Sequence, residues 1–315
     1  SDDKTVRLWE LQTGRCVEVF TFASAVLCVS WNPNSTVGLF AVALEEGGVV
    51  LIRPSGVFSG AIEESTDALF TEPQKSGGRW KLPLKDDEKW KAGIRLTLTA
   101  GKQVETVTWH KKGDYFATLS KRNKKTPVLI HRLSRRRTQN PFRKIKGEVQ
   151  DLKFHPTKPF LVVGTKRYVR IYDLMENKMK KKMNANVRWL STLEIHPSGD
   201  HLIIGSYDKR VNWFDLDMGN KPYKVFRYHK EGVRGLSIHK RLPLFSSCSH
   251  DGSIHVFHSR VYDDFSKDAL LVPVKILRGH QVVDLLGVMD VCFHPKLPWI
   301  VSAGADGTLI LWTDV

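Results

Sequence analysis

The stretch VCFHPKLPWIVSAGADGTLILW, residues 291–312, decides the fold. Apolar side chains alternate up to Phe293, a His-Pro turn follows, and a second apolar run begins at Ile300. After the turn at Asp306 and Gly307, a third run ends in Trp312. Short runs rich in β-branched and aromatic residues, separated by turn residues, indicate strands and not helices.

The same pattern recurs along the chain. Each copy is an apolar alternation followed by His-Pro or a close variant, and the six copies reach this point at Asn32, His110, His155, His196, His239 and His294. From His110 onward the copies are 45, 41, 43 and 55 residues apart, which brackets a repeat of about 40 to 45 residues. Four short antiparallel strands per repeat, arranged radially, predict a β-propeller, because that arrangement leaves only short, protected sheet edges.

The last repeat resembles the WD40 repeats in a set of four polar and aromatic residues. Ser302 and Asp306 are four residues apart, and Trp312 lies six further on. With the histidine before the first strand, this resemblance implies a structural tetrad whose members satisfy one another's buried polar groups: His280, Ser302, Asp306 and Trp312. The preceding repeat has His229, Ser247 and Asp251, but Phe257 replaces the tryptophan.

Serine, histidine and aspartate are also the ingredients of a hydrolase triad. The tetrad explains Ser302, His280 and Asp306 with the correct spacing, so we expect no catalytic residues. The dispersed cysteines and the histidines in strand-to-turn positions do not have the spacing of a metal site, and the glycine pairs lack the context of a phosphate loop. We therefore expect a protein that is not an enzyme and has no cofactor and no metal.

The repeats predict a single all-β domain over residues 1–315, a seven-bladed WD40 β-propeller. Seven third strands are expected, near 5–11, 49–53, 127–133, 168–174, 211–216, 254–258 and 308–313, but only six first strands. The first strands of blade one and the closing outer strand of blade seven are therefore expected upstream of this sequence. An insertion, 56–93, is expected between the third and fourth strands of blade two, and a smaller one, 259–270, in blade six.

The large insertion carries two tryptophans, Trp80 and Trp90. They either fold back on the propeller wall or serve as anchors for a protein partner.

Positive charge is concentrated in two windows. The chain has 49 Lys and Arg against 33 Asp and Glu, a formal net charge of +16. Eleven basic and no acidic residues lie in 121–146, and five basic and no acidic residues lie in 178–188. Such a concentrated field favours a polyanionic partner.

Longer stretches resemble one family, the block-of-proliferation ribosome-biogenesis proteins, whose C-terminal half is a WD40 propeller. The matching stretches are Leu129–Arg137, Trp213–Asp217, Lys221–Lys224, Val261–Asp264, Leu271–His280 and Gly287–Gly307. The resemblance implies a scaffold for assembly of the large ribosomal subunit and for pre-rRNA processing, in the nucleus, nucleolus and nucleoplasm. It implies as partners a second WD40 propeller protein, a Pescadillo-type protein and pre-ribosomal RNA, with no membrane and no small-molecule substrate.

Both windows are expected to include a connection from a third to a fourth strand, and these connections share one face of a propeller. We therefore expect one basic patch that contacts RNA phosphates without reading bases. Its residues are Lys121, Arg122, Lys124, Lys125, Arg135, Arg136, Arg137, Arg143, Lys144, Lys146, Lys180, Lys181 and Lys182. A solvated or protein-facing surface is the alternative. A generic WD40 adaptor that reads a peptide, without RNA binding, is the rival function.

Overall fold

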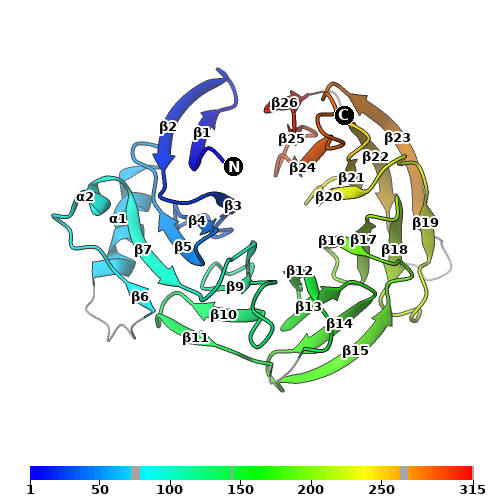
Figure 1. Cartoon of the computed structure of the whole chain (residues 1–315), viewed down its shortest axis with the longest axis horizontal. Helices are drawn as coiled ribbons and strands as arrows, with labels where there is room; N and C mark the ends of the chain where they lie inside the picture. The colour runs from blue at the N-terminus through cyan, green and yellow to red at the C-terminus, as the bar shows by residue number, and fades with distance from the viewer. Residues whose placement is uncertain (72–78, 143–144, 263–268, 314–315) are drawn as a thin grey trace. The chain divides into compact units, whose positions relative to one another are not determined.

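A computed structural model describes residues 1–71, 79–142, 145–262 and 269–313. The chain divides into two compact units, Ser1–Val149 and Gln150–Val315. In each unit the chain runs through small antiparallel sheets one after another (Figure 1).

The first unit contains three sheets. A two-stranded hairpin is followed by a five-stranded and then a four-stranded sheet. In spatial order these sheets consist of β1 (Thr5–Glu10) and β2 (Arg15–Thr21); β3 (Val26–Trp31), β4 (Phe40–Leu44), β5 (Gly48–Ile52), β7 (Ile94–Thr99) and β6 (Trp80–Lys81); and β11 (Arg137–Gln139), β10 (Val128–Arg132), β9 (Tyr115–Leu119) and β8 (Thr106–Trp109).

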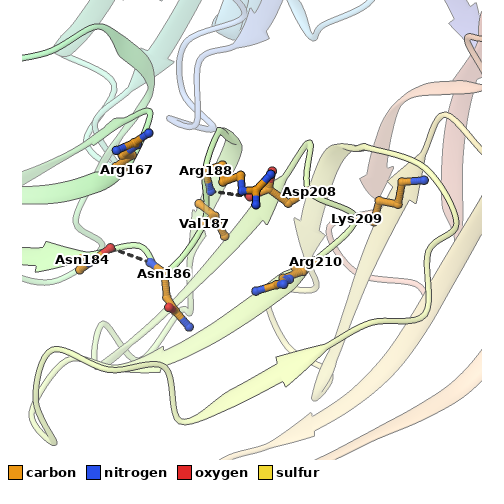
Figure 2. Close-up of a pocket in the computed structure, with 8 residues that line it drawn as sticks. All are labelled: Arg167, Asn184, Asn186, Val187, Arg188, Asp208, Lys209 and Arg210. Atoms are coloured by element: carbon orange, nitrogen blue, oxygen red, sulfur yellow. Dashed lines mark hydrogen bonds between the residues drawn. The ribbon is translucent and has the colours of Figure 1, made fainter.

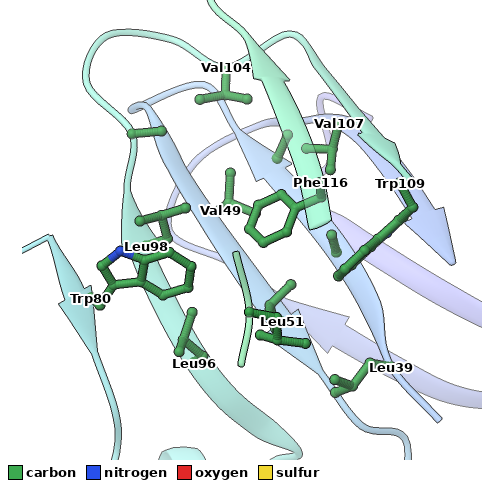
Figure 3. Close-up of a cluster of buried hydrophobic side chains, with 14 of the residues drawn as sticks. Leu39, Val49, Leu51, Trp80, Leu96, Leu98, Val104, Val107, Trp109 and Phe116 are labelled. Carbon is green, nitrogen blue, oxygen red and sulfur yellow. The ribbon is translucent and has the colours of Figure 1, made fainter. Parts of the chain in front are cut away.

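The core of the first unit lies between the five-stranded and the four-stranded sheet. Strands β4 and β5 are apolar at nearly every position, because both of their faces are covered. Leu51 and Leu98 from one sheet meet Phe116 and Trp109 from the other (Figure 3). The indole of Trp109 and the ring of Phe116 lie 4.9 Å apart.

The connection from β5 to β7 is folded. It contains two helices, α1 (Gly60–Thr71) and α2 (Glu88–Lys91), and the short strand β6, which pairs with β7. Asp87 caps α2 by accepting a hydrogen bond from the backbone nitrogen of Lys89. The insertion therefore adds a fifth strand to the sheet.

The second unit contains three four-stranded sheets and one three-stranded sheet. Each keeps its strands in chain order, and neighbouring strands are antiparallel wherever their register is resolved. The sheets are β12 (Val149–Phe154), β13 (Phe160–Thr165), β14 (Tyr168–Asp173) and β15 (Lys178–Asn184); β16 (Leu190–Ile195), β17 (His201–Ser206), β18 (Val211–Asp215) and β19 (Lys224–Phe226); β20 (Val233–Ile238), β21 (Leu244–Ser249), β22 (Ser253–Arg260) and β23 (Leu270–Arg278); and β24 (Val288–Phe293), β25 (Ile300–Gly304) and β26 (Leu309–Trp312).

Successive sheets of the second unit pack face to face. The first strands β16, β20 and β24 contact one another in sequence, and apolar clusters fill the spaces between the sheets. Within the third of these sheets Phe245 and Phe257 stack, with ring centroids 4.5 Å apart. This packing places the turns that join second to third strands of neighbouring sheets next to each other, where a pocket forms.

The expected all-β propeller is confirmed. Among the described residues, six sheets of three to five strands serve as blades, and each of them begins with one of the six predicted first strands. Trp9 pairs with Cys16 in the β1–β2 hairpin, and Trp312 lies in the separate β24–β26 sheet. The number of seven blades and the single domain remain predictions. Part of the smaller insertion, 263–268, lies outside the described residues.

Candidate nucleic-acid interface

The four residues of the predicted tetrad are linked by hydrogen bonds in the last sheet. The indole nitrogen of Trp312 donates to the hydroxyl of Ser302 at 2.8 Å. That hydroxyl lies 2.7 Å from Nε2 of His280, whose Nδ1 lies 3.2 Å from Asp306. Burial raises the pKa of Asp306, but hydrogen bonds from Thr308, Gln281 and His280 outweigh it and hold the pKa well below its ordinary value.

The hydroxyl of Ser302 is enclosed within this network. The side chain is 1% exposed, and the hydroxyl is already bonded to an indole on one side and an imidazole on the other. A nucleophilic serine needs an approach for its substrate.

The preceding sheet repeats three of the four residues. Nε2 of His229 lies 2.7 Å from the hydroxyl of Ser247, and Nδ1 lies 3.3 Å from Asp251. Phe257 stands where the tryptophan would be, and its ring packs on aromatic neighbours. The phenyl ring replaces the indole's polar contact with an apolar one.

The basic residues of the 121–146 window differ in exposure. Lys121 forms an ion pair with Glu105 at 3.0 Å. In the turn between β10 and β11, Arg135 and Arg137 are exposed, but Arg136 is buried and donates to the backbone oxygen of Leu69 at 3.3 Å. The remaining exposed members are Arg122, Lys124, Lys125 and Lys146, while Arg143 and Lys144 lie outside the described residues.

The lysines of the 178–188 window lie on β15, the outer strand of its sheet. Lys180 forms ion pairs with Asp173 and Glu176, at 3.5 and 3.3 Å. The hydrogen bond to Glu176 is the main cause that raises the pKa of Lys180. Lys181 donates to the backbone oxygen of Leu216. Lys182 is exposed and lies 4.2 Å above the ring of Tyr168.

The two windows belong to different compact units, so their merging into one patch remains a prediction. Arg136 is buried in the fold, and the ammonium groups of Lys180 and Lys181 already contact other residues of the same chain. Among the described residues, the exposed cations of the predicted set other than Lys180 are Arg122, Lys124, Lys125, Arg135, Arg137, Lys146 and Lys182.

The second unit also contains a basic pocket that the sequence analysis missed. It has a volume of about 700 Å³, and its walls carry Arg167, Arg188, Lys209 and Arg210 together with Asp208 (Figure 2). Arg167 and Lys209-Arg210 occupy the turn between the second and third strands of neighbouring sheets. Cations at the same turn in successive repeats are the signal that could have identified it.

The tryptophans of the insertion face inward. Trp80 is 3% exposed, and its indole donates to Thr138 at 3.0 Å. Trp90 is half-buried beneath the guanidinium of Arg95, which lies 4.1 Å from its ring. Arg95 in turn donates to Asp67 of α1 at 2.6 Å. These positions fit the folded-back alternative, and Trp80 in particular presents no surface to a partner.

In the described ranges, no helix is both long and apolar enough to cross a membrane. Over the same ranges, three or more His, Cys, Asp or Glu side chains do not gather in an arrangement that could hold a metal ion.

Comparison with known proteins identifies the repeats and the relatives. The family model described as "WD domain, G-beta repeat" matches residues 139–173, 220–258 and 271–313. Ribosome biogenesis protein bop1-B of Xenopus laevis is 47% identical over 99% of this chain and 43% of its own length. Human ribosome biogenesis protein BOP1 is 46% identical over 99% of this chain and 42% of its own length. Ribosome biogenesis protein ERB1 of Kluyveromyces lactis is 43% identical over 99% of this chain and 44% of its own length.

The chain spans less than half the length of these curated relatives. The alignments nevertheless cover 99% of the chain, including the stretches that carried the resemblance. The resemblance is therefore confirmed: this chain is a WD-repeat protein related along its whole length to the Bop1 and Erb1 ribosome biogenesis proteins.

Proposed function

We propose that the chain is a non-catalytic scaffold in nucleolar assembly of the large ribosomal subunit and in pre-rRNA processing. In this role it docks a second WD40 propeller protein and a Pescadillo-type protein, and it contacts precursor RNA through exposed cations. The observation that carries the proposal is the similarity over 99% of the chain to proteins named for ribosome biogenesis.

Charge and exposure support the RNA contact. Arg135, Arg137, Lys146 and Lys182 project from turns and outer strands, where a phosphate can reach them. Cations of this kind neutralise phosphates but carry no information about base sequence. We therefore expect binding that depends on chain length and salt, not on sequence.

RNA binding is tested with unrelated single-stranded RNAs of equal length. Affinities should agree, and if about five phosphates are neutralised, log affinity should fall with log salt at a slope of about −3.5. Affinities that differ strongly between sequences, or that do not change with salt, would contradict this part of the proposal.

Partner docking is tested by affinity purification of the chain from nucleolar extract and identification of the bound proteins. Recovery of a WD40 protein and a Pescadillo-type protein after nuclease treatment is the expected result. Recovery that disappears when RNA is digested would show that RNA, and not a protein surface, joins them.

One observation favours the rival function, a WD40 adaptor that reads a peptide. First strands of the second unit bring charged side chains together: Lys153 of β12 and Glu194 of β16 form an ion pair. Burial lowers the pKa of Lys153, but the carboxylates of Glu194, Asp151 and Asp290 outweigh this effect and raise the pKa above its ordinary value. A peptide that competes with neither RNA nor the protein partners, yet loses affinity in Lys153→Met, would support the adaptor.

We also propose that the ring has seven blades and is completed by upstream chain. The β1–β2 hairpin and the three-stranded β24–β26 sheet each have fewer strands than the other sheets. Both leave apolar side chains exposed, including Val17, Val19, Leu309 and Leu311. In a longer chain that adds the preceding residues, amides of β26 should exchange more slowly; unchanged exchange would count against completion.

A further inference from the structure

The basic pocket of the second unit, here called the arginine pocket, has walls from three chain segments. Arg167 lies in the β13–β14 turn, Arg188 in the β15–β16 connection, and Arg210 in the β17–β18 turn (Figure 2). Backbone hydrogen bonds hold these segments together: Ala185 donates to Arg167 at 2.8 Å, and Tyr207 donates to Trp189 at 3.0 Å. The walls are therefore fixed before any ligand arrives.

In the part of the chain that the structure describes, the three arginines have no ion-pair partner. Within the described part of the chain, none of their guanidinium groups has a carboxylate oxygen within 4.0 Å. The nearby carboxylate of Asp208 accepts the backbone N–H of Arg188 instead. Like charges that converge on one pocket repel each other, and an anion that enters it removes that repulsion.

The turn that carries Arg210 keeps a lysine where other repeats have glycine. Lys209 has φ of 68°, whereas the matching turns of the next two sheets have Gly252 and Gly307, with φ of 77° and 75°. A left-handed backbone is disfavoured for a residue that carries a side chain. The chain thus tolerates strain at a position where the side chain lines the pocket and its ammonium forms an ion pair with Glu231 at 3.0 Å.

Two exposed aromatic rings adjoin the pocket arginines in sequence. Tyr168 follows Arg167 and is 37% exposed, and Trp189 follows Arg188 and is 45% exposed. The ammonium groups of Lys182 and Lys166 lie 4.2 and 4.4 Å from their rings. Cations interleaved with exposed aromatic rings are typical of surfaces that bind single-stranded nucleic acid, where bases stack and phosphates pair with cations.

We propose that the arginine pocket binds phosphate groups of single-stranded RNA and that Trp189 and Tyr168 stack on the neighbouring bases. This rests on the proposed RNA contact, but it places a contact at residues outside the predicted patch. An acidic peptide offers carboxylates to the same arginines but no bases to the rings, so the exposed aromatics favour RNA.

The first experiment removes the charge. The variant Arg167→Gln/Arg188→Gln/Arg210→Gln is compared with a control that loses the same charge at exposed lysines of the first unit, Lys102→Gln/Lys111→Gln/Lys112→Gln. Loss of three phosphate contacts should make the slope of log affinity against log salt shallower by about 2 for the pocket variant. The control should keep the parent's slope. Equal slopes for both variants would overturn the pocket.

The second experiment tests stacking. Trp189→Ala should weaken binding of a single-stranded RNA at least about fivefold, and Trp189→Phe should retain most of it. An abasic oligonucleotide of equal length should bind the parent and Trp189→Ala alike. Equal loss for Trp189→Ala and Trp189→Phe, or loss toward the abasic probe too, would remove the stacking role.

A third variant, Lys209→Gly, should lower RNA affinity without disturbing the fold. It relieves the left-handed backbone and breaks an exposed ion pair with Glu231, whose loss costs little, so the thermal midpoint should not fall. RNA affinity should fall, because one cation is lost and the Glu231 carboxylate is left without it. Competition by polyglutamate as strong as by RNA would assign the pocket to an acidic peptide. If the parent binds no RNA, the proposed RNA contact fails together with the pocket. If the parent binds RNA and the pocket variants bind it with the same affinity and the same salt dependence, the pocket alone fails.

Discussion

Trp312 donates its indole N–H to the hydroxyl of Ser302, 2.8 Å away, and this bond is the first in a chain of hydrogen bonds that runs through the tetrad. Because Ser302 accepts from the indole, its own proton points to Nε2 of His280. Nδ1 of His280 then carries the proton that faces Asp306. The order is Trp to Ser to His to Asp, and removal of the first donor leaves the rest intact.

The first prediction concerns the two related aspartates. Asp306 accepts hydrogen bonds from His280, Gln281 and Thr308, and Asp251 accepts the matching bonds from His229, Lys230 and Ser253. From the sequence alone, a larger loss of stability is expected at Asp306, because only its repeat has the complete tetrad. The matching hydrogen bonds in the structure predict similar losses of stability at both aspartates. Asp306→Ala and Asp251→Ala should each lower stability by about 1 to 3 kcal/mol. Thermal midpoints that differ by more than about 4 °C would contradict this.

The second prediction separates the three arginines of the β10–β11 turn. Arg135→Glu/Arg137→Glu should weaken binding to every RNA sequence alike and leave the thermal midpoint in place, because both side chains are exposed. Arg136→Glu should lower the midpoint, because it buries a carboxylate against the backbone oxygen of Leu69. Binding and unfolding are measured on the same preparations. A midpoint that falls equally in both variants would show that the turn is structural throughout.

The third prediction is a pH effect that depends on His131. This imidazole lies between the hydroxyls of Thr118 and Thr138, at 2.9 and 3.0 Å. Burial, with a smaller effect of Arg79, lowers the pKa of His131 to about 3. In the unfolded chain this imidazole is protonated as pH falls below about 6.5, whereas in the folded chain it stays neutral until about pH 3. The free energy of unfolding therefore falls as pH falls through this window.

His131→Gln removes this titration and keeps a hydrogen-bonding side chain between the threonines. The parent should lose up to about 1.4 kcal/mol per pH unit more than the variant between pH 6 and pH 4. Denaturant unfolding at a series of pH values measures both slopes. Parallel slopes would mean that His131 titrates normally in the fold.

The fourth prediction concerns the insertion. Trp80→Ala should lower the free energy of unfolding by about 3 kcal/mol or more, because it empties a site packed against Phe116 and His131. Trp9→Ala, at a side chain that is 42% exposed, should have an effect within about 0.5 kcal/mol. If Trp80→Ala weakens partner binding without this loss of stability, the partner-anchor alternative returns.

The repeat architecture could be predicted because strand periodicity is a local property. The third strands expected near 168–174 and 211–216 are observed at Tyr168–Asp173 and Val211–Asp215. The fold of the insertion could not be predicted, because β6 pairs with β7 across a helix and Arg95 finds its partner Asp67 far away in sequence. Such contacts follow from packing and leave no periodic signal.

The candidate interface was predictable only where cations are consecutive. Arg135, Arg136 and Arg137 are equivalent in sequence, yet the left-handed backbone at Arg136, with φ of 46°, turns that side chain away from solvent. The arginine pocket shows the opposite case. Arg167, Arg188 and Arg210 are about twenty residues apart in the sequence, and only the stacking of neighbouring sheets brings them to one pocket.

The lysines of β15 have a consequence for the solubility of the protein. This strand is the outer edge of its sheet, and an edge offers unpaired backbone groups to any other strand that approaches. Repulsion between Lys178, Lys180 and Lys182 and a like-charged copy discourages that pairing. Neutral substitutions made to weaken RNA binding would therefore also invite strand-to-strand self-association, whereas substitution to glutamate would remove phosphate affinity and keep the edge charged.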